Sequence, residues 1–459
     1  MKNKLFISIY CGLMILLASC NNYLDVKPKG KIIPETAEDF STIIHYWLDQ
    51  IEKGRDDVII PNPEVMTTLE MFADDLNATL ASNFGYTSIY VGSAINKNQA
   101  TYKTLYSVIK DCNMVIGNMD DTESDLARTL LGTAWSIRSI CYYNLMQRYC
   151  EPYQPETAKE TLGLPLVDDF DMEAKPARAN LKETAEFIEE GFRKALSYNV
   201  SNEDFIFTSS VTKAYFARFF FWTQNWSNAI TYAKEVLEKY PMLEADEYVE
   251  AINQKQAKAH NVIIRSFTMD DDIGTMSYAQ ADIKSRPVDR NLVDLFAATD
   301  NDVRRKCNYD SKRIVNKIIT TKFRSEELCL IIAEAHAHLN QETDALGYLN
   351  QLRSKRITQN YIAYTIDNLP EVFQQNIKTD ATGIPLTKLM SAILCERRKE
   401  LFVEGDRWFE LKRNGRPEFW VAAKGKKFIT EKYLYTFPIP KADIRLFPDL
   451  LIQNPGYIE

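Results

Sequence analysis

Three glutamates in the C-terminal third of the chain have the residue type and spacing of catalytic carboxylates. Glu396, Glu400 and Glu404 recur at every fourth position, which places them on one face of a helix. Most glycoside hydrolases use two carboxyl groups, one of which must hold a proton. Arginine and lysine are interleaved throughout 397–407, however, and hydrogen bonds from arginine keep carboxylates ionised. The pattern therefore predicts ion-paired scaffolding and no catalytic residue.

The histidines and acidic stretches do not have the spacing of a metal site. His336 and His338 are two residues apart, so on a helix they point about 200° apart. His45 and His260 are isolated, and the acidic stretch 270–274 lacks the alternating spacing of a calcium loop. Neither a phosphate-binding glycine loop nor a nucleophile elbow occurs. We therefore expect no metal, no cofactor and no enzymatic activity.

Aromatic, amide and carboxylate side chains gather in two segments that lack helical periodicity. These segments are 74–90 and 276–286. A sugar presents apolar C–H faces and hydroxyl edges, so it is bound by exposed aromatic rings and by directed polar groups on loops. The alternative for each tyrosine is ordinary packing at the edge of the core. The residues that we expect to contact a ligand are Asn83, Tyr86, Tyr90 and Tyr278.

The N-terminus has the pattern of an exported lipoprotein. Two lysines precede the apolar run 5–17, which is a signal-peptide core and is shorter than the roughly 20 residues that span a bilayer. The run ends in LASC, which resembles the lipobox at which a cysteine accepts a diacylglycerol. The alternative is an ordinary secretory peptide with a chance cysteine. We expect 1–19 to be the signal peptide, Cys20 the lipidated residue and 20–34 a tether.

Composition excludes several classes of protein. With 459 residues and 45% apolar content the chain has enough material for a packed core, and 16 glycines with 24 tyrosines favour helices over a hairpin-rich β-protein. A net charge of −8 without a basic stripe argues against a nucleic-acid partner. Export permits disulfides, and the pairing of Cys112 with Cys141 is left open.

A repeat with an offset of 116 residues predicts paired helices. Aligning 212–241 with the stretch that begins at Leu328 superposes Ala217 on Ala333 and Ala229 on Ala345. Small residues at this spacing allow the close helix crossing of a tetratricopeptide (TPR) unit. The alternative is any antiparallel helix pair with an alanine-rich contact. Because the two units are far apart in the sequence, a uniform solenoid is excluded.

We therefore expect an all-α fold with minor β structure, in which TPR-like helix pairs form one scaffold with irregular loop insertions. This single domain is expected to span 35–459. The expected TPR-like units are about 97–149, 181–241 and 322–357. The insertions expected to bind ligand are about 50–96 and 243–315.

The C-terminal third resembles a known family. The segment 396–413, ERRKELFVEGDRWFELKR, is similar to the ERRxELxxEGxRWFDLxR signature of the SusD/RagB family of nutrient-binding outer-membrane lipoproteins. Two further segments, FPIP at 437–440 and QNPGY at 453–457, resemble the tail of that family, and CNNYLD at 20–25 resembles its mature start. Glu410 stands where aspartate is usual. The resemblance covers most of the chain.

The resemblance implies a function as well as a fold. A SusD-like protein of this kind would be anchored in the outer membrane by its lipid, at the cell surface, as a lid on a SusC-like TonB-dependent transporter. It would capture an oligosaccharide and deliver it without catalysis. A peptide-capturing, RagB-like member of the same architecture is the alternative, and a surface glycoside hydrolase is a more distant one.

Overall fold

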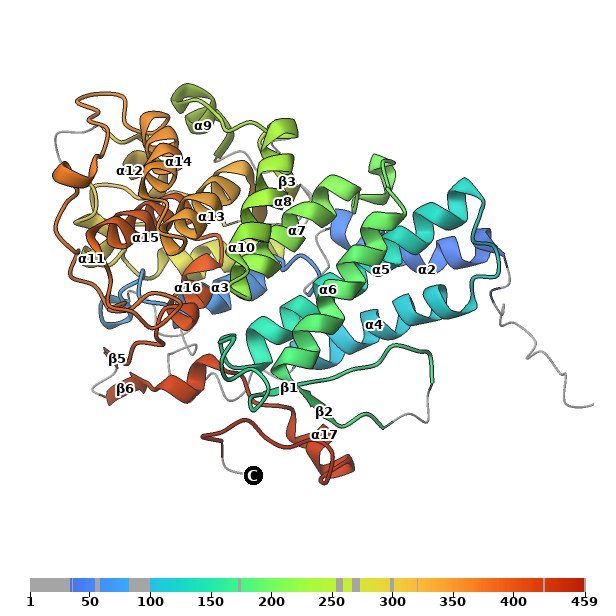
Figure 1. Ribbon diagram of the computed structural model, residues 1–459. Helices are drawn as coiled ribbons and strands as arrows, with labels where there is room; N and C mark the ends of the chain where they lie inside the picture. The colour runs from blue at the N-terminus through green and yellow to red at the C-terminus, as the bar shows by residue number, and fades with distance from the viewer. Residues whose placement is uncertain are drawn as a thin grey trace, which may run out of the picture.

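The computed structural model shows a mainly helical protein (Figure 1). It describes residues 34, 36–53, 58–81, 100–171, 175–252, 259–265, 273–297, 301–319, 321–423 and 426–457. In these ranges β structure consists of three two-stranded sheets and a few isolated bridges, so the expected all-α fold with minor β structure is confirmed. Within the same ranges the structure contains no helix that is long and apolar enough to cross a membrane.

The N-terminal half is a set of long helices around the buried helix α5, which packs against α2, α4 and α6 (Figure 1). Ser124 begins α5 by accepting a hydrogen bond from the Ala127 amide, as an N-cap residue does. The helices are α2 (Ala37–Glu52), α3 (Pro63–Phe72), α4 (Ala100–Asn118), α5 (Asp125–Tyr149), α6 (Leu181–Ser197), α7 (Ser209–Trp222) and α8 (Trp226–Lys239).

The C-terminal half combines helices with longer loops. Its helices are α9 (Ala245–Ile252), α10 (Ile273–Lys284), α11 (Arg290–Val293), α12 (Val303–Asn308), α13 (Ser325–His338), α14 (Glu342–Ser354), α15 (Lys388–Glu400), α16 (Asp406–Arg413) and α17 (Lys441–Leu446). Short 3₁₀ turns are η1 (Ala78–Leu80), η3 (Glu203–Phe205), η4 (Ile366–Asn368) and η5 (Lys432–Tyr435).

Three antiparallel strand pairs complete the described fold. They are β1 (Leu162–Pro165) with β2 (Arg178–Asn180), β3 (Val262–Arg265) with β4 (Lys322–Arg324), and β5 (Phe419–Ala423) with β6 (Lys426–Thr430). In the last pair Trp420 lies opposite Ile429, and both side chains are exposed. The six cysteines in the described residues, Cys112 and Cys141 among them, are free thiols.

The repeated sequence forms two helix pairs of the same construction. Ala217 and Ala229 are fully buried between α7 and α8, and Ala333 and Ala345 are fully buried in α13 and α14. Each pair turns through one residue with positive φ, Gln224 in the first and Asn340 in the second, which are again 116 positions apart. Helix α8 packs against α13, so the two pairs stack on one another.

A glycine joins the two helices that carry the C-terminal signature. Gly405 has a φ of 76° and is the N-cap of α16, a conformation that side chains disfavour. A Cβ atom at this position would lie 2.2 Å from the end of Met66 on α3. The sharp turn and the close approach together let α16 pack against α3 in the core, where Trp408 stacks on Tyr435 with their ring centroids 4.5 Å apart.

Candidate functional site

Glu400, the last residue of α15, accepts hydrogen bonds from three buried arginines. Arg324 Nη1 lies 2.6 Å from Glu400 Oε1, whereas Arg356 Nε and Arg304 Nη1 lie 3.1 Å and 3.3 Å from Glu400 Oε2. Burial by itself would raise the pKa of Glu400, but the three guanidinium charges outweigh burial and hold that pKa well below its ordinary value. The carboxylate therefore stays ionised.

Glu396, one turn earlier, is held in the same state. Burial opposes its ionisation, but Lys399 and Arg304 lower the pKa of Glu396 to about 2. Lys399 Nζ donates to Glu396 Oε1 at 2.5 Å, and Arg304 Nη2 donates to Glu396 Oε2 at 2.7 Å. Two permanently ionised carboxylates lack the proton of a general acid. The glutamate pattern in the sequence thus corresponds to an ion-pair network.

The signature helices, α15 and α16, also hold the middle of the first insertion. Arg398 Nε donates to Asp75 Oδ1 at 2.6 Å, and Arg407 Nε donates to Asp74 Oδ1 at 2.7 Å. Asn376 Nδ2 donates to the second oxygen of Asp74 at 2.8 Å. Burial would raise the pKa of Asp74, but Arg407 and Arg398 hold it well below its ordinary value. Segment 73–79 is therefore attached rigidly to the scaffold.

The second insertion is joined to the same segment by backbone hydrogen bonds. The Asn77 amide donates to the Pro287 carbonyl at 2.8 Å, and the Asp289 amide donates to the Asp75 carbonyl at 2.7 Å. The side chains continue the pairing, since Asn77 Nδ2 donates to Asp289 Oδ2 at 3.0 Å. Two stretches more than 200 residues apart thus form one continuous surface.

A cavity of about 380 Å³ opens on this surface, a volume in the range typical of ligand pockets. We call it the surface cavity. Its walls come from 73–79 without Asp75, from Asp289 and Asn291, and from 418–421 at β5, with Asn376 beside Asp74. Trp420 is 59% exposed at its edge, and Lys427 Nζ lies 4.9 Å from the centroid of that ring. The surface cavity therefore combines an exposed aromatic ring with amides and carboxylates.

The expected ligand residues relate to this cavity unevenly. Asn83, Tyr86 and Tyr90 lie outside the described residues, although the segment that precedes them forms a wall of the surface cavity. Tyr278 lies on α10 with 64% of its surface exposed, and it is not among the described residues that line the cavity. Sequence reasoning missed Trp420. The only local signal was a single tryptophan in a short apolar stretch after Pro417. This stretch has no polar and apolar alternation that would indicate which side chains are exposed.

The histidines take part in packing. His336 Nδ1 pairs with Gln341 Oε1 at 2.5 Å, and the His338 ring stacks on Trp226 with a centroid distance of 4.1 Å. Among the residues that the structure describes, no three histidine, cysteine, aspartate or glutamate side chains are grouped as metal ligands would be.

Two family models match the chain over complementary parts. The model described as "SusD family" matches residues 303–457, and the model described as "Starch-binding associating with outer membrane" matches residues 22–221. The first range contains the Glu400 network, and the second contains the segment 73–79. The chain belongs to the SusD/RagB family. No curated protein matches the sequence.

Solved SusD-like structures share the fold over almost the whole chain. A SusD superfamily protein from Bacteroides vulgatus has a TM-score of 0.73 at 17% identity, covering 93% of this chain and 100% of its own. A SusD-like carbohydrate-binding protein from the same species has a TM-score of 0.66 at 19% identity, covering 91% and 98%. A laminarin-binding SusD-like protein has a TM-score of 0.59 at 16% identity, covering 92% and 99%. At these identities the likeness concerns the fold.

Proposed function

We propose that this SusD/RagB protein captures an oligosaccharide in the surface cavity and has no catalytic role. The observation that carries this proposal is the exposed ring of Trp420 beside the amides and carboxylates of Asn77, Asp289 and Asn291. An indole ring fits the apolar face of a sugar, while amide and carboxylate groups fit its hydroxyl edges. Arg407 holds Asp74, which lines the cavity, and Arg398 holds the adjacent Asp75, so this wall of the site is fixed in position.

Two comparisons support a glycan in preference to other ligands. One matching family model is described as starch-binding, and a protein of the same fold is described as binding laminarin. The network around Glu396 and Glu400 argues against hydrolysis, because both carboxylates are ionised and buried. Binding of neutral oligosaccharides without release of products is the expected behaviour. Saturable binding of peptides without binding of glycans would favour the peptide-capturing alternative, and turnover of a glycan would contradict the proposal.

Replacing Trp420 by alanine should weaken glycan binding at least tenfold. The substitution removes the aromatic platform while leaving the polar wall of the cavity in place, and a tenfold change corresponds to about 1.4 kcal/mol. Isothermal titration calorimetry with the best oligosaccharide from a glycan array measures the change. Tyr46→Ala is the matched control, because Tyr46 is an aromatic residue with 56% exposure on α2. Equal affinities of the Trp420 variant and the unmodified protein would contradict the proposed site.

We also propose that the protein is anchored through Cys20 at the surface of the outer membrane, where it delivers its ligand to a SusC-like TonB-dependent transporter. The lipobox-like LASC sequence and the family description "associating with outer membrane" support this location. Several acyl chains on one cysteine give durable attachment, whereas a single chain does not.

Cys20→Ala should move the protein from the membrane fraction to the soluble fraction. Because residue 20 is not among the residues of the proposed glycan site, the affinity for glycan should not change. Membrane fractionation and mass spectrometry of the N-terminal peptide test the first expectation, and calorimetry tests the second. If the variant still sediments with membranes and carries lipid, the assignment of Cys20 is wrong.

A further inference from the structure

The charged residues that line the surface cavity are all acidic. They are Asp74, Asp289 and Glu418, whereas neither lysine nor arginine occurs among the described residues that line it. The charge of Asp74 is compensated, because Arg407 donates to both of its carboxylate oxygens, at 2.7 Å and 3.0 Å. Within the described ranges, Asp289 and Glu418 have no ion-pair partner. The surface cavity therefore has two carboxylates whose charge no neighbouring cation offsets.

Asp289 is held in position by donors that carry no charge. Its Oδ1 accepts from the Asn291 backbone amide at 3.0 Å, as the N-cap of α11, and its Oδ2 accepts from Asn77 Nδ2 at 3.0 Å. Each carboxylate oxygen has a further lone pair, so both can accept another hydrogen bond from a ligand. Because Asp289 is half-buried, water screens its charge less than it screens a charge on the open surface.

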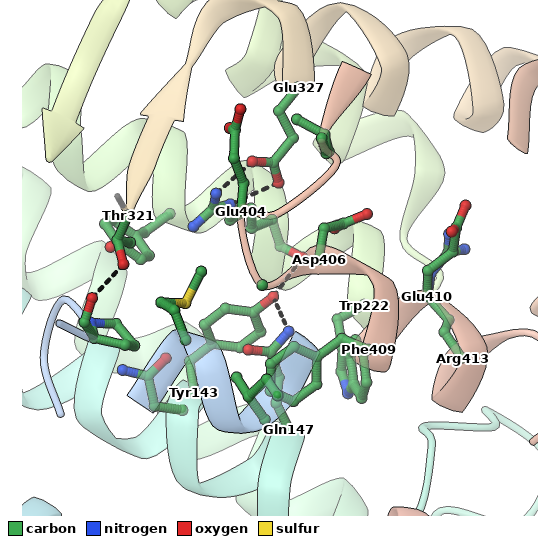
Figure 2. A pocket seen from close by; sticks show the side chains of 18 of the residues that line it. Tyr143, Gln147, Trp222, Thr321, Glu327, Glu404, Asp406, Phe409, Glu410 and Arg413 are labelled. Carbon is green, nitrogen blue, oxygen red and sulfur yellow. Dashed lines mark hydrogen bonds and ion pairs between the residues drawn. The ribbon is translucent and has the colours of Figure 1, made fainter. Parts of the chain in front are cut away.

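A second cavity, of about 110 Å³ between α3, α5, α7, α15 and α16, shows the contrasting arrangement (Figure 2). All four acidic residues that line it accept a hydrogen bond from an arginine. The pairs are Glu327 with Arg218, Glu404 with Arg324, Asp406 with Arg397 and Glu410 with Arg407, at 2.7–3.0 Å. The carboxylates of the second cavity are thus used by the scaffold, whereas those of Asp289 and Glu418 are accessible to a ligand.

One cation lies near the surface cavity, at the ring of Trp420. Lys427 Nζ is 4.9 Å from the centroid of that ring, and Lys427 is not among the described residues that line the cavity. Its ammonium group is already engaged by the indole, in the manner of a cation–π contact. The positive charge therefore stands beside the exposed ring, while the negative charges stand in the walls.

We propose that the surface cavity selects oligosaccharides that contain a protonated amino sugar, with the ammonium group beside Asp289 and Glu418 and a sugar ring on Trp420. This inference rests on the proposed function of the cavity as a glycan site. An ammonium group has three N–H donors and a positive charge, so it fits carboxylates that have no cation of their own.

The same two carboxylates rank other sugars by their charge. The hydroxyl groups of a neutral sugar donate to Asp289 and Glu418 without any attraction between charges, so a neutral oligosaccharide binds more weakly than an amino sugar. A uronic acid or a sulfated sugar brings a negative charge to the acidic walls and is repelled. The expected order of affinity is therefore amino sugar, neutral sugar and acidic sugar.

Three tetrasaccharides with the same β-1,4-linked backbone test this order: those of glucose, glucosamine and glucuronate. Calorimetry with the purified full-length protein at about pH 6, where an amine resembling an α-amino group is protonated, measures the affinities. We expect the glucosamine tetramer to bind at least about tenfold more tightly than the glucose tetramer, and the glucuronate tetramer at least about tenfold more weakly. Both differences should shrink as the salt concentration rises, because salt screens charges.

Two variants assign the preference to the carboxylates. Asp289→Asn and Glu418→Gln each remove one charge and keep the shape of the wall, and asparagine is also a good N-cap for α11. Each should lower the ratio of glucosamine to glucose affinity about threefold, and the double variant should remove most of the preference. Glu186→Gln is the matched control, because it removes a negative charge at a 61% exposed position on α6 and should leave the ratio unchanged.

A tetralysine peptide separates recognition of an amino sugar from general attraction of cations to an acidic protein. It should bind at least about tenfold more weakly than the glucosamine tetramer and should be insensitive to Trp420→Ala. Tetralysine binding as tight as that of the glucosamine tetramer would overturn the proposal. So would a glucosamine tetramer that does not bind, that binds no more tightly than the glucose tetramer, or whose preference is unchanged in the Asp289 and Glu418 variants.

These failures differ from a failure of the proposed function. If another glycan still binds and loses affinity in Trp420→Ala, the glycan site stands and only the selection of amino sugars is wrong. If no glycan binds in a way that depends on Trp420, the proposed function itself is wrong.

Discussion

Glu400→Ala should strongly destabilise the folded protein. The substitution leaves Arg304, Arg324 and Arg356 with no carboxylate at the centre of their cluster, and their side chains are 0% to 1% exposed. Removing one partner of a single buried ion pair costs about 3–5 kcal/mol, whereas the whole stability of a domain is about 5–15 kcal/mol. We expect a loss of at least about 4 kcal/mol, seen as low soluble yield and a lower urea midpoint followed by circular dichroism.

Two variants make the result specific. Glu400→Gln keeps the shape and one acceptor oxygen, so it should lie between alanine and the unmodified protein. Glu186→Ala removes a 61% exposed glutamate that pairs with Lys182 on α6, and it should change stability by less than about 1 kcal/mol. A Glu400→Ala protein that unfolds at the same urea concentration as Glu186→Ala would show that the cluster does not hold the fold together.

The cluster connects the scaffold to the candidate glycan site. Arg304 comes from α12, Arg324 from β4 and Arg356 from the turn directly after α14, so Glu400 connects three parts of the C-terminal half to α15. Arg398, two residues before Glu400 on α15, donates to Asp75, which stands between the cavity-lining residues Asp74 and Leu76. The signature thus stabilises the scaffold on one face of its helix and positions the candidate glycan site on another.

Elements with a local signal could be predicted from the sequence. The alanines of the repeat, such as Ala217 and Ala333, identified helix pairs because helix crossing requires small residues at a fixed spacing. The sequence also predicts that Glu396 and Glu400 are ionised, but of the cations beside them only Lys399 pairs with them, with Glu396. The arginines that hold Glu400 are Arg304, Arg324 and Arg356, which the sequence does not indicate. The domain limits and the ligand roles of Asn83, Tyr86 and Tyr90 remain predictions.

Contacts between distant segments could not be predicted. Asp74 is 333 positions from Arg407, and nothing near either residue indicates its partner. Trp420 reaches the surface cavity because β5 packs against η1, a contact that depends on the tertiary fold alone.

Glu70→Gln should make the protein more stable at neutral and alkaline pH. Glu70 on α3 is 1% exposed, and the Gly405 amide donates to its Oε1 at 2.6 Å. Burial and the neighbouring Asp75 carboxylate raise the pKa of Glu70 from 4.5 to about 8. The folded protein therefore holds a proton that the unfolded chain releases above about pH 4.5. The contribution of Glu70 to the free energy of unfolding is complete below about pH 4.5 and is lost as the pH rises to about 8.

Comparing Glu70→Gln with the unmodified protein across pH isolates the titration of Glu70, because all other titrating groups are common to both proteins. Glutamine keeps the acceptor for Gly405 and carries no titrating proton. The free energy of unfolding of the variant should therefore rise relative to that of the unmodified protein between about pH 5 and pH 8, by up to about 5 kcal/mol. Urea unfolding at several pH values measures the difference. Glu64→Gln changes an exposed position of the same helix, so it should leave the dependence of the free energy of unfolding on pH unchanged. If the difference between Glu70→Gln and the unmodified protein is constant with pH, Glu70 is ionised in the folded state and the assignment of its proton is wrong.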